Sequence, residues 1–228
     1  MATTATTLGA LARAGLYRLL ALGFAYPAPD VREEFLRVLE LHVSQEPQFG
    51  DFRADLAALR LGDSDELIAD YTRLFDRMIE CSPYESDNVG GMRAFTKARD
   101  LADVQGFYRA FGLELGEDAA EMNDHIGIEL EFASVLALKE AYFQDEGNNE
   151  GLEITLDARR AFLRDHVARW VPAFCERLAA SAGHPFYRAL AGVTRAVVAA
   201  DVAEVGVVVP TPAAGPGTPE PDEFGCGA

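Results

Sequence analysis

The side chains with the clearest chemical potential lie close together in the middle of the chain. Asp124 and His125 are adjacent, and Glu129 follows His125 by four residues. Residues four apart lie on one face of a helix, so His125 and Glu129 could share a metal ion or a hydrogen bond. Adjacent helical residues point about 100° apart, which prevents Asp124 from orienting His125 as a triad aspartate does. Because the sequence offers no third ligand, the pattern favours a hydrogen bond over a metal.

Signatures of the common enzyme classes are missing. The chain has no phosphate-binding or dinucleotide-binding glycine motif, no G-x-S-x-G turn and no H-E-x-x-H pair. It also lacks the paired E-x-x-H motifs of a di-iron bundle. Cys81, Cys175 and Cys226 are odd in number and far apart, which argues against a disulfide framework or a zinc finger. We therefore expect no enzymatic activity, no cofactor and no bound metal.

The charge of the chain is strongly acidic. The 37 acidic and 20 basic residues give a net charge of −17, which makes nucleic acid an unsuitable partner. Between Ala110 and Leu138 the acidic residues are not accompanied by a single Lys or Arg. This acid-only stretch is either a solvated helix face or an electrostatic seat for a basic partner, and the sequence leaves both alternatives open.

Helical periodicity recurs along the chain and strand alternation is scarce, which predicts an all-α fold. The turn-rich segment Cys81–Gly91 predicts a loop. Proline, glycine and capping residues divide the rest. We expect helices over residues 8–26, from residue 30, near residues 52–59, over residues 63–78, 92–111 and 118–144, through residues 162–170 and over residues 185–205.

Residues 1–208 are expected to form a single globular helical domain, with a candidate hinge near residues 112–118. Residues 209–228 are rich in Pro and Gly with three acids and no base, which predicts a disordered tail. No apolar stretch is long enough to span a bilayer, and the N-terminus has no signal-peptide pattern. These features predict a cytoplasmic protein without stable membrane insertion.

Three aromatic-rich segments follow one another in a fixed order. They read E-x4-Y-x2-L-F with a later P-Y-E (residues 66–75 and 83–85), D-H-I-x2-E-L-E-F (124–132), and F-L-x2-H-x3-W-x3-F with a later P-F-Y (162–174 and 185–187). In this order and spacing they resemble the TorD/DmsD/NarJ family of redox-enzyme maturation chaperones, over roughly residues 8–201. The sequences C-x-P-Y-E (81–85) and Q-G-F-Y-R-A-F-G (105–112) are similar to the branch that serves ethylbenzene, selenate, chlorate or dimethyl sulfide oxidoreductases.

The resemblance implies a non-catalytic all-α chaperone. Such a protein binds the N-terminal, twin-arginine-type leader of a molybdopterin oxidoreductase subunit and holds the apoenzyme for cofactor insertion and assembly before export. The implied partner is therefore the precursor of that subunit, and the chain is a monomer or a homodimer. A stable accessory subunit of the oxidoreductase complex is the alternative. A basic leader with an apolar segment requires an apolar groove rimmed with acids, which suits the acid-only stretch.

The family's leader-binding positions correspond to nine residues of this chain: Tyr71, Leu74, Phe75, Pro83, Tyr84, Glu85, Asp124, His125 and Glu129. The first three also have the spacing of ordinary core residues. Pro83 and Tyr84 lie in a predicted loop, where core packing is a weaker explanation. Asp124 is either a helix cap or the main seat for the arginines of the leader. We expect His166 and Trp170 to be structural.

Overall fold

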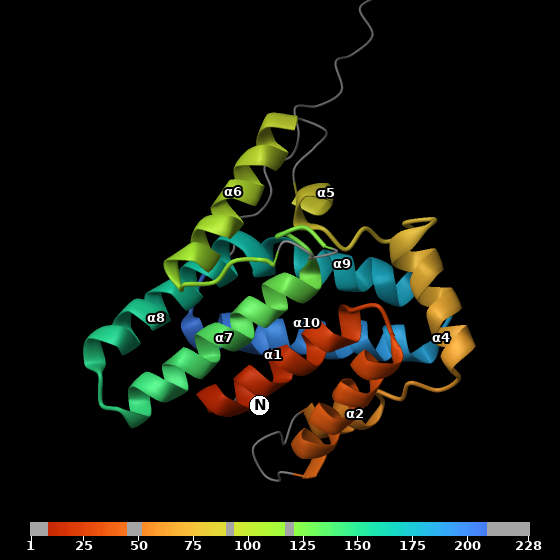
Figure 1. Cartoon of the computed structure of the whole chain (residues 1–228), viewed down its shortest axis with the longest axis horizontal. Coiled ribbons are helices and arrows are strands. Elements are labelled where there is room, and N and C mark those ends of the chain that lie inside the picture. The colour runs from red at the N-terminus through yellow and green to blue at the C-terminus, as the bar shows by residue number, and fades with distance from the viewer. Residues whose placement is uncertain (1–8, 45–51, 90–93, 117–120, 209–228) are drawn as a thin grey trace, which may run out of the picture.

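The computed structural model describes residues 9–44, 52–89, 94–116 and 121–208 (Figure 1). Within these ranges the chain is helical and forms no β-sheet, which confirms the predicted all-α fold. No helix among these residues is long and apolar enough to cross a membrane. The helices are α1 Ala10–Phe24, α2 Pro29–Ser44, α3 Arg53–Ala57, α4 Ser64–Tyr71, the π turn η2 Thr72–Asp76, α5 Glu85–Val89, α6 Ala94–Ala110, α7 Ile126–Asp145, α8 Asn149–Phe162, the π turn η3 Leu163–Val167, α9 Ala168–Ser181 and α10 Pro185–Val205.

Helices α1 and α7 form a closely packed pair that lies in front of α10 in Figure 1. They run antiparallel, since Ala14 near the start of α1 accepts a hydrogen bond from Ser134 in the middle of α7 (2.8 Å) and Ala21 lies near the start of α7. Small residues allow the close approach. A Cβ atom added at Gly127 would lie 3.1 Å from Nδ1 of His125 and 3.4 Å from the carbonyl oxygen of Ala21, so the backbone of α1 lies directly against the start of α7.

The hydrophobic core lies between this pair and helices α9 and α10. Its largest buried side chains include Trp170 of α9, which packs on Phe174 with ring centroids 5.3 Å apart. Phe174 in turn contacts Phe24 at the end of α1 (5.8 Å). At Gly23 an added Cβ atom would meet the side chain of Leu190 at 2.6 Å, so glycine lets α1 approach α10. The aromatic segments of the sequence therefore form one continuous core.

Two boundaries differ from the sequence prediction. Helix α7 begins at Ile126 and not near residue 118, because the Ile126 amide donates to the carbonyl of Pro83 (2.8 Å) and the preceding residues pair with the 83–85 segment. The predicted loop Cys81–Gly91 contains the short helix α5. Of the candidate hinge, residues 112–116 form a turn and a segment without regular secondary structure. Residues 117 and 118 lie outside the described residues, as does the predicted tail, residues 209–228.

A buried polar cluster ties four helices together at the end of the molecule away from α5. Arg159 of α8 donates to Asp201 of α10 (Nε to Oδ1, 3.0 Å) and to Glu140 of α7 (3.2 Å). Arg13 of α1 donates to the same Glu140 oxygen (2.5 Å), and the hydroxyl of Tyr17 donates to Asp201 (2.6 Å). All five side chains are buried. Each buried charge is stabilised only by its partners, because water cannot reach it to replace a partner that is removed.

We expect Arg159→Ala to destabilise the fold by about 3–5 kcal/mol, because it leaves Asp201 without its main cationic partner in a buried site. Arg160→Ala is the matched control. Arg160 is the next residue, and its ion pair with Asp157 is exposed, so the cost should stay below about 0.5 kcal/mol. Urea unfolding followed by circular dichroism measures both values. Similar losses for the two variants would contradict a structural role for the cluster.

Candidate functional site

A short backbone pairing joins the segment before α5 to the segment before α7. Tyr84 and His125 form an isolated antiparallel bridge. The amide of Glu85 donates to the carbonyl of Asp124 (2.9 Å), and the amide of Ile126 donates to the carbonyl of Pro83 (2.8 Å). We call residues 83–86 with residues 124–126 the bridge. It brings together two of the three sequence motifs, which lie some forty residues apart in the chain.

His125 caps helix α7 through its ring. Its Nδ1 atom accepts a hydrogen bond from the amide of Gly127 (3.1 Å), which requires this nitrogen to be unprotonated. Burial lowers the pKa of His125, with the charges of Glu121 and Asp124 opposing that shift. The imidazole is therefore a neutral hydrogen-bond acceptor that fixes the start of α7, and protonation would remove the cap.

The acidic residues of the bridge point inward. Asp124 is fully buried, and its Oδ2 atom accepts from the amide of Ser86 (3.0 Å) at the start of α5. Glu85 is also fully buried, with Oε2 2.9 Å from Nδ1 of His166. Glu129 accepts from the indole nitrogen of Trp170 (3.1 Å). These contacts connect the bridge to the third motif. They agree with the structural role expected for His166 and Trp170.

Glu129 holds its proton more tightly than an ordinary glutamate. Burial is the largest cause of its raised pKa, followed by the negative charge of Glu85, while the hydrogen bond from Trp170 opposes the shift. A neutral Glu129 can donate to the carboxylate of Glu85, which explains how two carboxyl groups share one dry site. The Glu85–Glu129 pair stabilises the packing beneath the bridge, and because both side chains are buried it offers no exposed acid, base or nucleophile.

Beside the bridge, aromatic and acidic side chains form what we call the Tyr84 corner: Tyr26, Tyr71, Tyr84, Glu121 and His125. Tyr26 is exposed, Tyr84 and Glu121 are partly exposed, and Tyr71 and His125 are buried behind them. The hydroxyl of Tyr84 donates to the carboxylate of Glu121, and its ring packs edge-on against His125 at 5.3 Å. The ring of Tyr71 contacts that of Tyr26, which is half exposed, at 5.4 Å. Burial raises the pKa of Tyr71, and the nearby charge of Glu121 adds to the shift. Aromatic faces and a carboxylate therefore meet at the surface.

The nine predicted residues fall into three groups in the structure. Some reach the corner: Tyr71, Tyr84 and His125. Others are buried beneath it without polar contacts of their side chains: Leu74, Phe75 and Pro83. The predicted acids are all buried, which corrects the expectation that they line an accessible groove: Glu85, Asp124 and Glu129.

Two residues of the corner were not among the predicted positions. Glu121 belongs to the acid-only stretch, but nothing in its spacing distinguishes it from its neighbours. Tyr26 follows the apolar stripe of α1 and gives the sequence signal of a core residue, although half of its surface is exposed. Only the folded arrangement places Glu121 beside Tyr84 and Tyr26 beside Tyr71.

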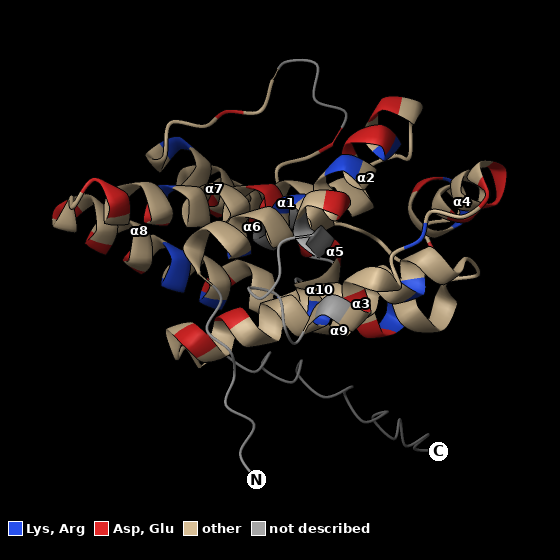
Figure 2. Ribbon diagram, turned by 90° about the horizontal axis from the view of Figure 1, so that it is seen from below, with Lys and Arg blue, Asp and Glu red and all other residues tan. Residues whose placement is uncertain are grey.

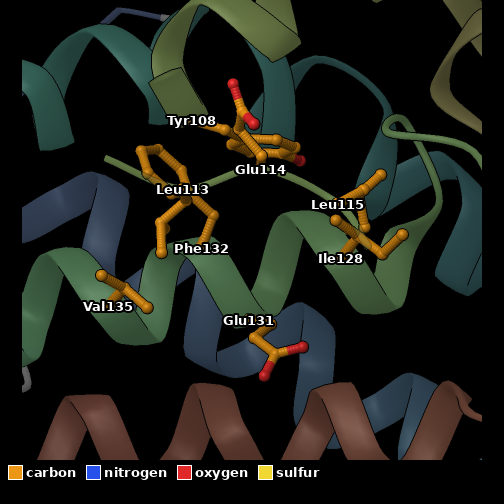
Figure 3. A pocket seen from close by; sticks show the side chains of 8 residues that line it. All are labelled: Tyr108, Leu113, Glu114, Leu115, Ile128, Glu131, Phe132 and Val135. Atoms are coloured by element: carbon orange, nitrogen blue, oxygen red, sulfur yellow. The ribbon is translucent and has the colours of Figure 1, made fainter. Parts of the chain in front are cut away.

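A separate apolar recess lies between the segment after α6 and helix α7 (Figure 3). Its volume is about 270 Å³. Figure 3 shows Glu114 and Glu131 on opposite sides of it, with the apolar side chains between them. The lining residues are Tyr108, Leu113, Glu114, Leu115, Ile128, Glu131, Phe132 and Val135. Almost all of them belong to the acid-only stretch. Among the described residues, no group of three His, Cys, Asp or Glu side chains could hold a metal ion.

A family model described as nitrate reductase delta subunit matches residues 41–176, more than half of the chain. The chain belongs to the nitrate reductase delta subunit family. This is the TorD/NarJ group that the three motifs resemble, and chlorate and selenate reductase chaperones among the relatives support the expected branch. The family prediction is thus confirmed.

Individual members of the nitrate reductase delta subunit family match over different lengths. The perchlorate reductase assembly chaperone protein of Dechloromonas aromatica is 27% identical over 208 residues, covering 86% of this chain and 90% of that protein. The chlorate reductase assembly chaperone protein of Ideonella dechloratans is 38% identical over 82 residues, covering 36% and 41%. These relatives are named for assembly and not for catalysis, which confirms the prediction of a non-enzymatic protein.

A solved structure supports the all-α fold. A redox enzyme maturation protein from Archaeoglobus fulgidus superposes with a TM-score of 0.53 at 20% identity, covering 82% of this chain and 93% of that chain.

We expect Glu129→Gln to become more stabilising, relative to wild type, as the pH rises above 5. When the pKa of a group is higher in the folded protein than in the unfolded chain, the free energy of unfolding falls as the pH rises from the unfolded pKa through the folded pKa. Glutamine keeps the acceptor for Trp170 and has no proton to lose, so this loss disappears. Urea unfolding at pH 5, 6, 7 and 8 measures the difference, with Glu150→Gln as an exposed control. A pH-independent difference would argue against a shared proton.

Proposed function

We propose that this chain is a chaperone that binds the N-terminal, twin-arginine-type leader of a molybdopterin-containing oxidoreductase subunit. It holds the subunit for cofactor insertion and assembly before export. The perchlorate and chlorate reductase chaperones among its relatives support an oxidoreductase client. Because a leader is recognised before export, the proposed place of action is the cytoplasm.

The observation that carries this proposal is the contact between Tyr84 and Glu121 at the surface. The carboxylate of Glu121 is only partly covered, so an arginine of a leader can approach it. A guanidinium forms strong charge-assisted hydrogen bonds with a carboxylate and stacks on aromatic rings. Met122, which follows Glu121 in the chain, and Tyr26, which packs on Tyr71, have exposed side chains that offer apolar surface for the segment that follows the arginines.

We assign different roles to the nine family positions. The residues proposed to contact the leader directly are Tyr84 and Glu121, and the buried rings of Tyr71 and His125 pack behind them. The buried apolar residues support the rings from below: Leu74, Phe75 and Pro83. The buried acids hold the bridge in place: Glu85, Asp124 and Glu129. This assignment follows their exposure, because a ligand cannot touch a fully buried carboxylate without opening the bridge.

The family description favours a second candidate function. A protein related to a delta subunit can instead remain in the finished oxidoreductase complex as an accessory subunit. Purification of the tagged chain from a strain that makes the client separates the two functions. Association with the precursor alone supports the chaperone, and association with mature, cofactor-loaded enzyme supports the subunit.

We expect Glu121→Gln to weaken binding of a synthetic twin-arginine leader by roughly ten- to a hundredfold. A charge-assisted hydrogen bond contributes about 1.5–3 kcal/mol to binding. The difference in affinity between variant and wild type should become smaller at high salt, because salt screens charges at an accessible surface. Isothermal titration at two salt concentrations measures the effect. Glu153→Gln on α8 removes an equally charged, exposed side chain and should bind normally. Equal affinities for both variants would place the leader elsewhere.

Asp124→Asn distinguishes a leader contact from a structural cap. Because the side chain is buried and accepts from the Ser86 amide, we expect the melting temperature to fall while the remaining folded protein binds the leader nearly normally. The titration is run well below the melting temperature of the variant. An unchanged melting temperature with a tenfold or greater loss of affinity would show instead that leader arginines reach Asp124.

A further inference from the structure

The outward face of α7 carries a line of side chains that we call the α7 stripe: Ile128, Glu131, Val135, Leu138 and Tyr142. Ile128, Val135 and Tyr142 are each seven residues apart, and the other two lie between them, which is the spacing of a helix–helix seam. Leu138 is 47% and Tyr142 is 59% exposed. Large apolar residues exposed in a line, and not singly, mark an interaction surface.

The recess supplies a receptor for one side chain of a partner helix. Its α7 wall consists of residues at positions i, i+3, i+4 and i+7, the four that surround a knob in helix packing: Ile128, Glu131, Phe132 and Val135. The 113–115 segment forms the opposite wall and deepens the hole (Figure 3). A volume of about 270 Å³ lies below the range of about 300–1,000 Å³ of small-molecule sites, so the recess suits one or two side chains.

Charges around the stripe are balanced, unlike those of the whole chain, in which acidic residues outnumber basic ones (Figure 2). Arg18 of α1 pairs with Glu131 at 2.5 Å, and both side chains are exposed. Lys139 lies over the ring of Phe111 at 5.7 Å, and Glu114 stands at the far side of the recess. A strongly basic partner would meet two bases here, and a strongly acidic partner would meet two acids. A second copy of the same face has the matching balance.

We propose that two copies of the chain associate through their α7 stripes, with the two α7 helices antiparallel. If the two-fold axis passes between residues 136 and 137, Val135 of each copy faces Leu138 of the other. The same register places Tyr142 of each copy over the recess of the other, so the surface is self-complementary as a two-fold interface requires. The Tyr142 hydroxyl of one copy then lies beside Glu131 of the other copy and donates a hydrogen bond to its carboxylate.

This interface leaves the Tyr84 corner open. None of the corner residues belongs to the stripe, so a dimer can bind one leader on each copy. The inference therefore does not depend on the proposed function. It also predicts the opposite salt response. Two chains that each carry a net charge of −17 repel, so added salt should strengthen dimerisation, whereas it should weaken leader binding.

Sedimentation equilibrium of the full chain over a range of concentrations tests the proposal. We expect a dimer for wild type, a monomer for Leu138→Glu, and a Kd raised about tenfold or more for Tyr142→Ala. Ile154→Glu is the matched control. Ile154 is 58% exposed on α8, outside the stripe, and its replacement should leave the dimer unchanged. Circular dichroism checks that each variant is folded, which we expect because the replaced side chains already face solvent.

A wild-type chain that stays monomeric at every concentration and salt level would overturn the proposal. So would a dimer that survives both α7 substitutions, because its interface would then lie elsewhere. Titration of the synthetic leader against the same variants keeps the two proposals separate. Leu138→Glu should bind leader with wild-type affinity, and absence of leader binding in every protein would count against the proposed function alone.

Discussion

The backbone pairing of residues 83–86 with residues 124–126 is the constraint on which the rest of the site depends. It replaces the helical hydrogen bonds that would otherwise extend α7 toward residue 118, and it sets the first residue of both α5 and α7. The pairing is only a few residues long and would be marginal alone. It persists because Asp124 and His125 each cap a helix from within it, so that backbone and side-chain contacts support the same geometry.

The acidic residues of the central stretch serve two different purposes according to their depth. Asp124 and Glu129 lie under the bridge, where they accept from an amide and from an indole, and burial raises the pKa of Glu129. Those at the surface, such as Glu121 and Glu131, are held by a phenol or an arginine and remain accessible. A run of like charges therefore folds into a compact site because its buried members, Asp124 and Glu129, exchange water for specific donors.

The sequence was sufficient for the fold class and the family, because helical periodicity and the order of the aromatic motifs are local signals. Asp63 shows this well, since it begins the helix expected over residues 63–78 and its side chain accepts from the amides of Asp65 and Glu66. The inward direction of Glu85 and Asp124 could not be predicted. It results from a pairing between segments some forty residues apart. The sequence gives the residue type, which is the same whether the carboxylate caps a buried helix or faces water. The same limit hid Glu121, whose partner Tyr84 is distant along the chain.

Trp170 is the single tryptophan of the chain, and its indole nitrogen is bonded to Glu129 beneath the bridge. The protein thus contains its own optical probe at the point where the third motif meets the other two. Indole emission responds to the polarity and protonation of its hydrogen-bond partner, and no second indole obscures the signal. Any event that shifts the bridge, whether a peptide at the corner or a proton at Glu129, can be followed by intrinsic fluorescence without a label.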